Sequence, residues 1–111
     1  FESKTAAFSA EMAELAAFSR ALGHPARLRI VQMLAERGTC ICGEVVDALP
    51  LSQASVSRHL KLLKEAGIIR GEIDGARSCY CLDSARLERL RAEMTSYLSN
   101  LAIPTETPDC C

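Results

Sequence analysis

Apolar residues recur at spacings of three and four along much of the chain, and this spacing predicts amphipathic helices. We expect helices over residues 9–23, 25–37 and 84–101, and one that begins after Ser52 and ends at Gly67. Pro25 suits the first position of its helix, Gly38 ends that helix, and the Ser52 hydroxyl suits an N-terminal cap. The buried stripe of the helix over 25–37 is expected to hold Leu28, Ile30, Val31 and Leu34. A further short helix is expected over 44–49, closed by Pro50.

Two-residue alternation predicts strands in the remaining stretches. Residues 39–42 form a brief strand, with Ile41 between two cysteines. Residues 68–73 and 77–82 flank Asp74 and Gly75, a strong signal for a β-hairpin. The expected fold is therefore mainly α-helical with a small β-wing.

The short helix, the turn at Pro50 and the following helix have the layout of a helix-turn-helix that fits the DNA major groove. The second helix begins with small polar and cationic side chains, which can read base edges or grip phosphate. Arginines near the hairpin suit phosphate or a minor groove. The residues expected to contact double-stranded DNA are Ser52, Gln53, Ser55, Ser57, Arg58, His59, Lys61, Arg70 and Arg77. By itself, the pattern also fits an ordinary helical hairpin with a solvated face.

Length and charge narrow this interpretation. The 111 residues make one domain, which we expect over residues 1–103, with a flexible cysteine-terminated tail over 104–111. The net charge of -1 means that DNA affinity must come from local clustering of basic residues. No apolar run approaches the ~20 residues of a membrane span, and no export signal is seen, so we expect a cytoplasmic protein without a membrane partner. No catalytic constellation or phosphate-binding glycine loop appears, so an enzyme is not expected.

The terminal helices are expected to pair with a second copy of the chain. Leu87, Leu90, Met94, Leu98 and Leu101 form a heptad-like stripe, and the first helix also has a spare apolar face. Packing of the last helix on its own core is the simpler alternative. A twofold homodimer would suit a palindromic operator.

Six cysteines occur as three close pairs, Cys40 with Cys42, Cys79 with Cys81, and Cys110 with Cys111. Neighbours this close rarely satisfy disulfide geometry with each other, but they suit a soft ion that takes several thiolates. Burial as small hydrophobic residues is the alternative. Zinc is the chemical rival, because four thiolates suit a tetrahedral site.

The runs LGHPARLRIVQML and LSQASVSRHLKLLKEAGII, with a Cys-x-Cys between them and a hairpin and leucine-rich helix after them, resemble the ArsR family of winged-helix metalloregulatory repressors. The resemblance covers roughly residues 22–101. It implies a homodimer that binds operator DNA without any cofactor and releases it when a toxic ion binds.

The resemblance also suggests which ion. Zinc-sensing members use Asp and His on the last helix, and residues 84–101 contain no His. Arsenite-sensing members resemble this chain at Cys40 and Cys42, but Val45 stands where their third cysteine is found. In the implied fold the strand over 39–42 pairs with the second wing strand, so Cys79 and Cys81 would join Cys40 and Cys42 on one face. Cys110 and Cys111 resemble the C-terminal pairs of some members and are secondary ligands.

We therefore expect a repressor whose effector is trivalent arsenic or a trivalent organoarsenical, with trivalent antimony as an alternative. Three other readings stay open: a repressor responsive to zinc or another soft metal, a thiol redox-switch regulator, and a metal-buffering or arsenic-handling protein.

Overall fold

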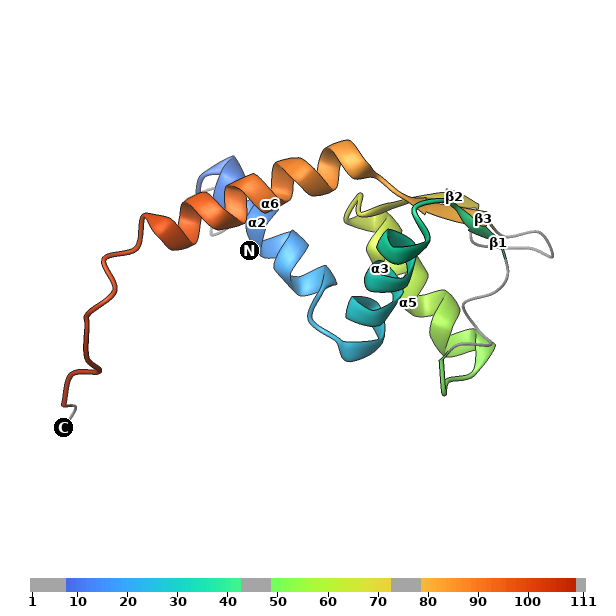
Figure 1. Ribbon diagram of the computed structural model, residues 1–111, viewed down its shortest axis with the longest axis horizontal. Helices are drawn as coiled ribbons and strands as arrows, with labels where there is room; N and C mark the ends of the chain where they lie inside the picture. Colours follow the sequence, from blue (N-terminus) through green and yellow to red (C-terminus); the bar gives the residue numbers. More distant parts are fainter. Residues whose placement is uncertain (1–7, 43–48, 73–78, 110–111) are drawn as a thin grey trace.

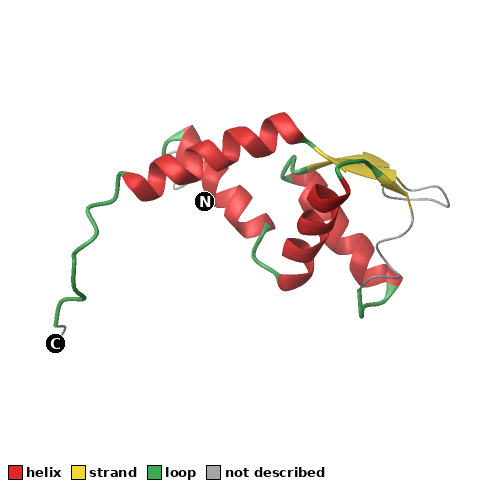
Figure 2. Ribbon diagram, in the orientation of Figure 1, coloured by secondary structure: helices red, strands yellow, loops and turns green. Residues whose placement is uncertain are grey.

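The computed structural model describes residues 8–42, 49–72 and 79–109. Along the chain it contains α2 (Ala10–Ala21), α3 (Pro25–Arg37), β1 (Ile41–Cys42), α5 (Gln53–Glu65), β2 (Ile69–Glu72), β3 (Cys79–Leu82) and α6 (Ser84–Ser99). These elements, with a small wing beside the helices, give the winged helix-turn-helix expected from the sequence (Figure 2). The helix expected over 44–49 and the turn at Asp74 and Gly75 lie almost wholly outside the described residues.

The helix ends follow the local capping signals. The His24 ring accepts a hydrogen bond from the Ala26 N–H at 3.0 Å, Pro25 opens α3, and Gly38 ends it with a φ of 69°. Ser9 and Ser52 cap α2 and α5 through their hydroxyls, as Asp83 caps α6 through its carboxylate. Each cap satisfies a backbone N–H that has no partner inside the helix.

β3 is the central strand of an antiparallel sheet with the order β1-β3-β2. Ile41 pairs with Tyr80, and Cys42 pairs with Cys79. On the other side of β3, Gly71 pairs with Tyr80 and Arg70 with Cys81. Ile41 and Tyr80 face the core and are 1% and 2% exposed, so the neighbouring cysteines face the opposite side of the sheet.

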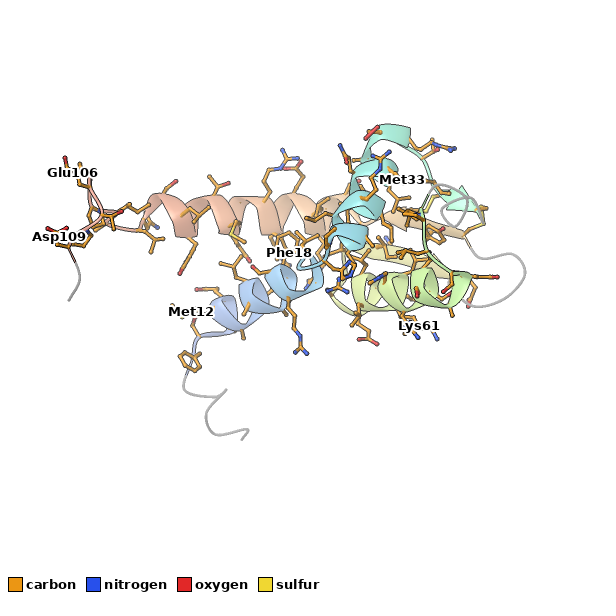
Figure 3. All side chains as sticks on the ribbon, turned by 90° about the horizontal axis from the view of Figure 1, so that it is seen from below. Met12, Phe18, Met33, Lys61, Glu106 and Asp109 are labelled. Carbon is orange, nitrogen blue, oxygen red and sulfur yellow. A yellow bond between two sulfur atoms is a disulfide. The ribbon has the colours of Figure 1, made fainter. Side chains whose placement is uncertain are left out.

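The core lies between α3, α5, the sheet and the inner faces of α2 and α6. Its buried members include Phe18, Ile30, Leu34, Val56, Leu60, Leu63, Ile68, Ile69 and Leu90. Figure 3 shows Phe18 on the side of α2 that faces the other helices. The expected stripe of α3 is wrong at one position, because Leu28 is 53% exposed whereas Ile30 and Leu34 are buried. α3 contacts both α5 and β3, and its buried residues are Ala26, Ile30 and Leu34.

α2 and α6 pack against each other at the end of the molecule opposite the sheet (Figure 1). After α6 the described residues run as an exposed segment without helix or strand to Asp109. Within the described ranges, no helix has both the length and the apolar character required to cross a membrane.

Candidate DNA interface and candidate metalloid site

α5 presents a polar, cationic face around its N-terminal half. The Ser52 hydroxyl accepts a hydrogen bond from the Ser55 N–H at 3.2 Å, which fixes the first turn. Arg58 donates from Nη2 to the Ser55 hydroxyl at 3.3 Å, so its guanidinium lies along the outer surface of the helix. Val56, Leu60 and Leu63 hold the opposite face in the core. The helix is thereby oriented with its polar start free to enter a groove.

The residues predicted to contact DNA differ in their exposure to solvent. Exposed residues are Ser52, Gln53, Arg58 and Lys61 on or next to α5, and Arg70 on β2, whereas Ser55 and Ser57 are half-buried. Figure 3 shows Lys61 on the side of α5 that points away from the other helices. Arg77 lies outside the described residues. Three of the exposed members are basic, namely Arg58, Lys61 and Arg70.

His59 lies against α3 instead of on that outer face. Its ring is 4.4 Å, centroid to centroid, from the ring of His24, and Arg27 donates from Nη1 to its Nδ1 at 3.1 Å. Burial lowers the pKa of His59, and the charges of His24, Arg27 and Arg58 lower it further. A neutral His59 accepts the Arg27 hydrogen bond, so this pair ties α5 to the start of α3.

Three cationic side chains outside the predicted DNA-contact set join elements around α5. Arg27 donates from Nε to the Ala21 carbonyl at 2.6 Å, Lys64 donates to the Gly71 carbonyl of β2 at 2.6 Å, and Arg86 donates to the Ala66 carbonyl at 3.1 Å. Arg86 thus caps the C-terminal end of α5 from α6. No sequence motif indicates these hydrogen bonds, because each carbonyl partner lies in another element.

The pairing of α2 with α6 is partly ionic. Arg89 donates to Glu14 Oε2 at 3.0 Å, and Arg86 approaches the same oxygen at 3.8 Å. Glu93 stands close by with its Oε2 buried and without a hydrogen-bond partner. Burial raises the pKa of Glu93, and the negative charge of Glu14 raises it further.

The cysteines of β1 and β3 meet across the sheet. Cys40 is joined to Cys81 and Cys42 to Cys79 by disulfides, with Cα–Cα separations of 4.3 and 4.0 Å. Antiparallel neighbours that do not exchange backbone hydrogen bonds lie about 4.5 Å apart, which brings their side chains within bonding reach. The structure therefore brings together the four cysteines that the strand pairing implied by the resemblance, with alternation along each strand, predicts on one face.

The four cysteines form two disulfides, whereas free thiolates were expected from the sequence. Bonds form between the two close sequence pairs and not within either, because cross-strand neighbours are nearer than residues i and i+2 of one strand. Within the ranges described, no three free His, Cys, Asp or Glu side chains are arranged to hold an ion. A thiolate site on these strands requires both disulfides to be reduced. Val45, Cys110 and Cys111 lie outside the described residues.

Known proteins resemble the chain over most of its length. A family model described as a helix-turn-helix domain matches residues 22–72. The transcriptional repressor SmtB of Mycobacterium tuberculosis is 39% identical over 84 residues, which are 76% of this chain and 62% of that protein. The regulator CmtR of Mycobacterium tuberculosis is 33% identical over 94 residues, which are 85% of this chain and 77% of that protein.

Solved structures agree with these relatives. The structure of a possible transcriptional regulator for arsenical resistance has a TM-score of 0.61 and 32% identity, and covers 70% of this chain and 80% of that one. The chain spans less than two thirds of SmtB but more than three quarters of CmtR. The sequence motifs, the winged helix-turn-helix and these relatives agree: the chain belongs to the ArsR/SmtB family of helix-turn-helix transcriptional regulators.

Proposed function

We propose that this protein is a metalloid-responsive repressor that binds operator DNA as a homodimer and releases it when trivalent arsenic, trivalent antimony or a trivalent organoarsenical binds cysteine thiolates. The observation that carries the proposal is the meeting of Cys40, Cys42, Cys79 and Cys81 on one face of the sheet. That sheet includes the wing of the DNA-binding unit. DNA binding needs no cofactor in this proposal.

The apolar surface of the terminal helices supports a homodimer. Large exposed side chains gather on α2, on α6 and beside them, namely Phe8, Met12, Tyr97, Leu98, Leu101 and Ile103. Met12 stands at the outer end of α2 in Figure 3. Burial of such a surface contributes about 25 cal/mol per Å². A twofold pair would present two α5 helices to successive major grooves.

β3 links the proposed ion site to α5, the helix proposed to contact DNA. β3 carries Cys79 and Cys81 and pairs with β2 through Gly71, whose carbonyl accepts the hydrogen bond of Lys64 from α5. An ion held by β1 and β3 would change how the wing sits against the reading helix. A coupling free energy of about 1–3 kcal/mol is typical of such linkage.

Operator release measured on reduced protein tests the proposal. A promoter fragment is titrated with wild type, Cys40→Ser and Cys79→Ser, each with and without arsenite. We expect the wild type to release DNA and both variants to need much more arsenite. The Cys110→Ser/Cys111→Ser variant is the control for the tail. Release by both strand variants at the wild-type concentration contradicts the shared site.

A redox switch is the second candidate, and the two cross-strand disulfides favour it. Oxidation would join β1 to β3 covalently, and reduction would free them. Peroxide would then change operator affinity without any metalloid, and reductant would restore it. An unchanged affinity after complete oxidation excludes this candidate. Zinc or another soft metal remains the alternative effector, and a structure of the relative CmtR is described as a cadmium sensor.

A further inference from the structure

An open groove separates the second half of α2 from the second half of α5. Its walls carry small or apolar side chains, namely alanines of α2 together with Leu62 and Ala66. Arg20 from the last turn of α2, Arg27 from α3 and Glu65 from α5 supply its charged lining. Alanine side chains are too short to cover a neighbouring guanidinium, and Arg20 is exposed to solvent.

The guanidinium of Arg20 is available to an outside anion. Within residues 8–42, 49–72 and 79–109, its side chain makes no hydrogen bond or ion pair. Its backbone carbonyl accepts a hydrogen bond from Nη2 of Arg27 at 3.4 Å, and Arg27 also holds His59 of α5. The backbone of Arg20 is therefore fixed relative to α5. A guanidinium in this state matches the geometry of a phosphate group.

Arg20 lies between the apolar surface of the terminal helices and the polar face of α5. Phe8 and Met12 are exposed at the start of α2, whereas Arg20 belongs to its last turn. Figure 3 shows α2 running from Met12 at its outer end towards α5, which carries Lys61. In a twofold pair built on the terminal helices, Arg20 would therefore lie nearer to the axis than α5 of the same chain.

The DNA between two half-sites presents backbone phosphates to this position. The recognition helices of a twofold dimer enter major grooves whose centres are about 34 Å apart. Between them, a minor groove with its bordering phosphates faces the protein, because the two grooves alternate along one side of the duplex. Contacts to these phosphates position a protein on DNA without reading the bases.

We propose that Arg20 of each subunit binds a backbone phosphate in the spacer between the half-sites, so that the DNA interface extends from α5 to the end of α2. This inference rests on the proposed function, because it needs operator DNA bound to a homodimer. Glu65 on the α5 wall of the groove repels phosphate, so the DNA backbone passes over Arg20 and not into the groove. The contact adds affinity without sequence preference.

The salt dependence of operator binding tests the charge of Arg20. A promoter fragment is titrated with wild type, Arg20→Gln, Arg20→Lys and Arg91→Gln at several salt concentrations. Each phosphate contact contributes about 0.9 to the slope of log affinity against log salt, so Arg20→Gln should lower the slope of a dimer by about 2 and weaken binding about tenfold. Arg20→Lys keeps the charge and should keep the slope.

Arg91→Gln is the control for the loss of one positive charge. Arg91 pairs with Glu88 on α6 at 3.4 Å. α6 lies along the edge of the molecule opposite the connection from α2 to α3 (Figure 1). The salt slope of Arg91→Gln should therefore equal that of wild type.

An uncharged DNA backbone locates the contact. Footprinting first defines the half-sites, and methylphosphonate linkages then replace phosphates either in the spacer or within the half-sites. We expect the spacer replacement to weaken wild type about tenfold and to have little effect on Arg20→Gln, because that variant has already lost the contact. Replacement within the half-sites should weaken both proteins alike.

The outcomes separate this contact from the proposed function. Circular dichroism and urea unfolding first establish that Arg20→Gln is folded as wild type is. A wild-type salt slope for Arg20→Gln, or equal losses of both proteins on the spacer-modified fragment, would overturn the contact while DNA binding stands. If wild type binds no fragment of its own promoter, the proposed function fails, and the spacer contact fails with it.

Discussion

Arg27 donates a hydrogen bond from its Nη1 to Nδ1 of His59 over 3.1 Å, so α3 holds α5 through one side-chain pair. The Nε of the same guanidinium donates to the Ala21 carbonyl at the end of α2. One side chain therefore joins α2, α3 and α5. The orientation of the polar face of α5 depends on this junction as well as on the apolar core beneath it.

Replacement of Arg27 by Gln should lower both stability and operator affinity. The change removes hydrogen bonds from a charged donor, which are worth about 1.5–3 kcal/mol each at most when their acceptors stay buried. Urea unfolding and operator titration measure the two losses. Arg29→Gln is the matched control, because Arg29 is on the same helix but is exposed and contacts Gln32 and Glu36. Equal effects of the two variants would show that the junction has no special role.

The stability of the protein should fall when His59 becomes protonated. Burial and the neighbouring cations hold its pKa below the ordinary value of 6.5. A lowered pKa means that the unfolded chain binds the proton more readily, so this contribution is complete above pH ~6.5 and is lost as pH falls below it. Unfolding at pH 7.5 and 5.5 should show a larger loss for wild type than for His59→Gln. The same loss in both proteins would place the titrating group elsewhere.

Replacement of Glu93 by Gln should stabilise the pairing of α2 and α6 at neutral pH. Burial and Glu14 raise the pKa of Glu93, so its folded form favours the protonated carboxyl and loses stability as pH rises through that pKa. A neutral amide removes the repulsion from Glu14. The thermal midpoint of Glu93→Gln should exceed that of wild type at pH 7 and approach it at pH 4. Glu88→Gln, at an exposed site paired with Arg91, should change little.

Gly71→Ala should be the most damaging glycine substitution in the wing. Gly71 has a φ of 130°, and an added Cβ would overlap the backbone carbonyl of Cys79 on the neighbouring strand. Such backbone strain costs about 1–3 kcal/mol before the overlap is counted. Gly38 also has a positive φ, of 69°, but nothing lies within 4 Å of its added Cβ. Gly38→Ala should therefore cost only about 1 kcal/mol. Chemical denaturation of both variants measures the two losses of stability. A smaller loss for Gly71→Ala than for Gly38→Ala would contradict the predicted overlap with the Cys79 carbonyl.

Local signals in the sequence determined most of the helix boundaries. α3 begins at Pro25 and ends at Arg37 as its flanking residues predict, and α5 follows Ser52 as its cap requires. These predictions hold because a cap or a left-handed glycine acts on backbone groups within one turn. Alternation along the strands, together with the strand pairing that the family resemblance implies, likewise predicted that Cys40, Cys42, Cys79 and Cys81 share a face, since side-chain direction follows the backbone.

Tertiary structure alone decided which side chains meet. The pairing of Cys40 with Cys81, the contact of His59 with Arg27, and the cap that Arg86 places on α5 join elements far apart in the chain. The exposure of Leu28 was decided in the same way, because an apolar residue is buried only where a neighbouring element covers it. The sequence by itself determined a winged helix-turn-helix with clustered cysteines. Packing decided how those cysteines pair and how the reading helix is held, because both depend on distances that no local pattern encodes.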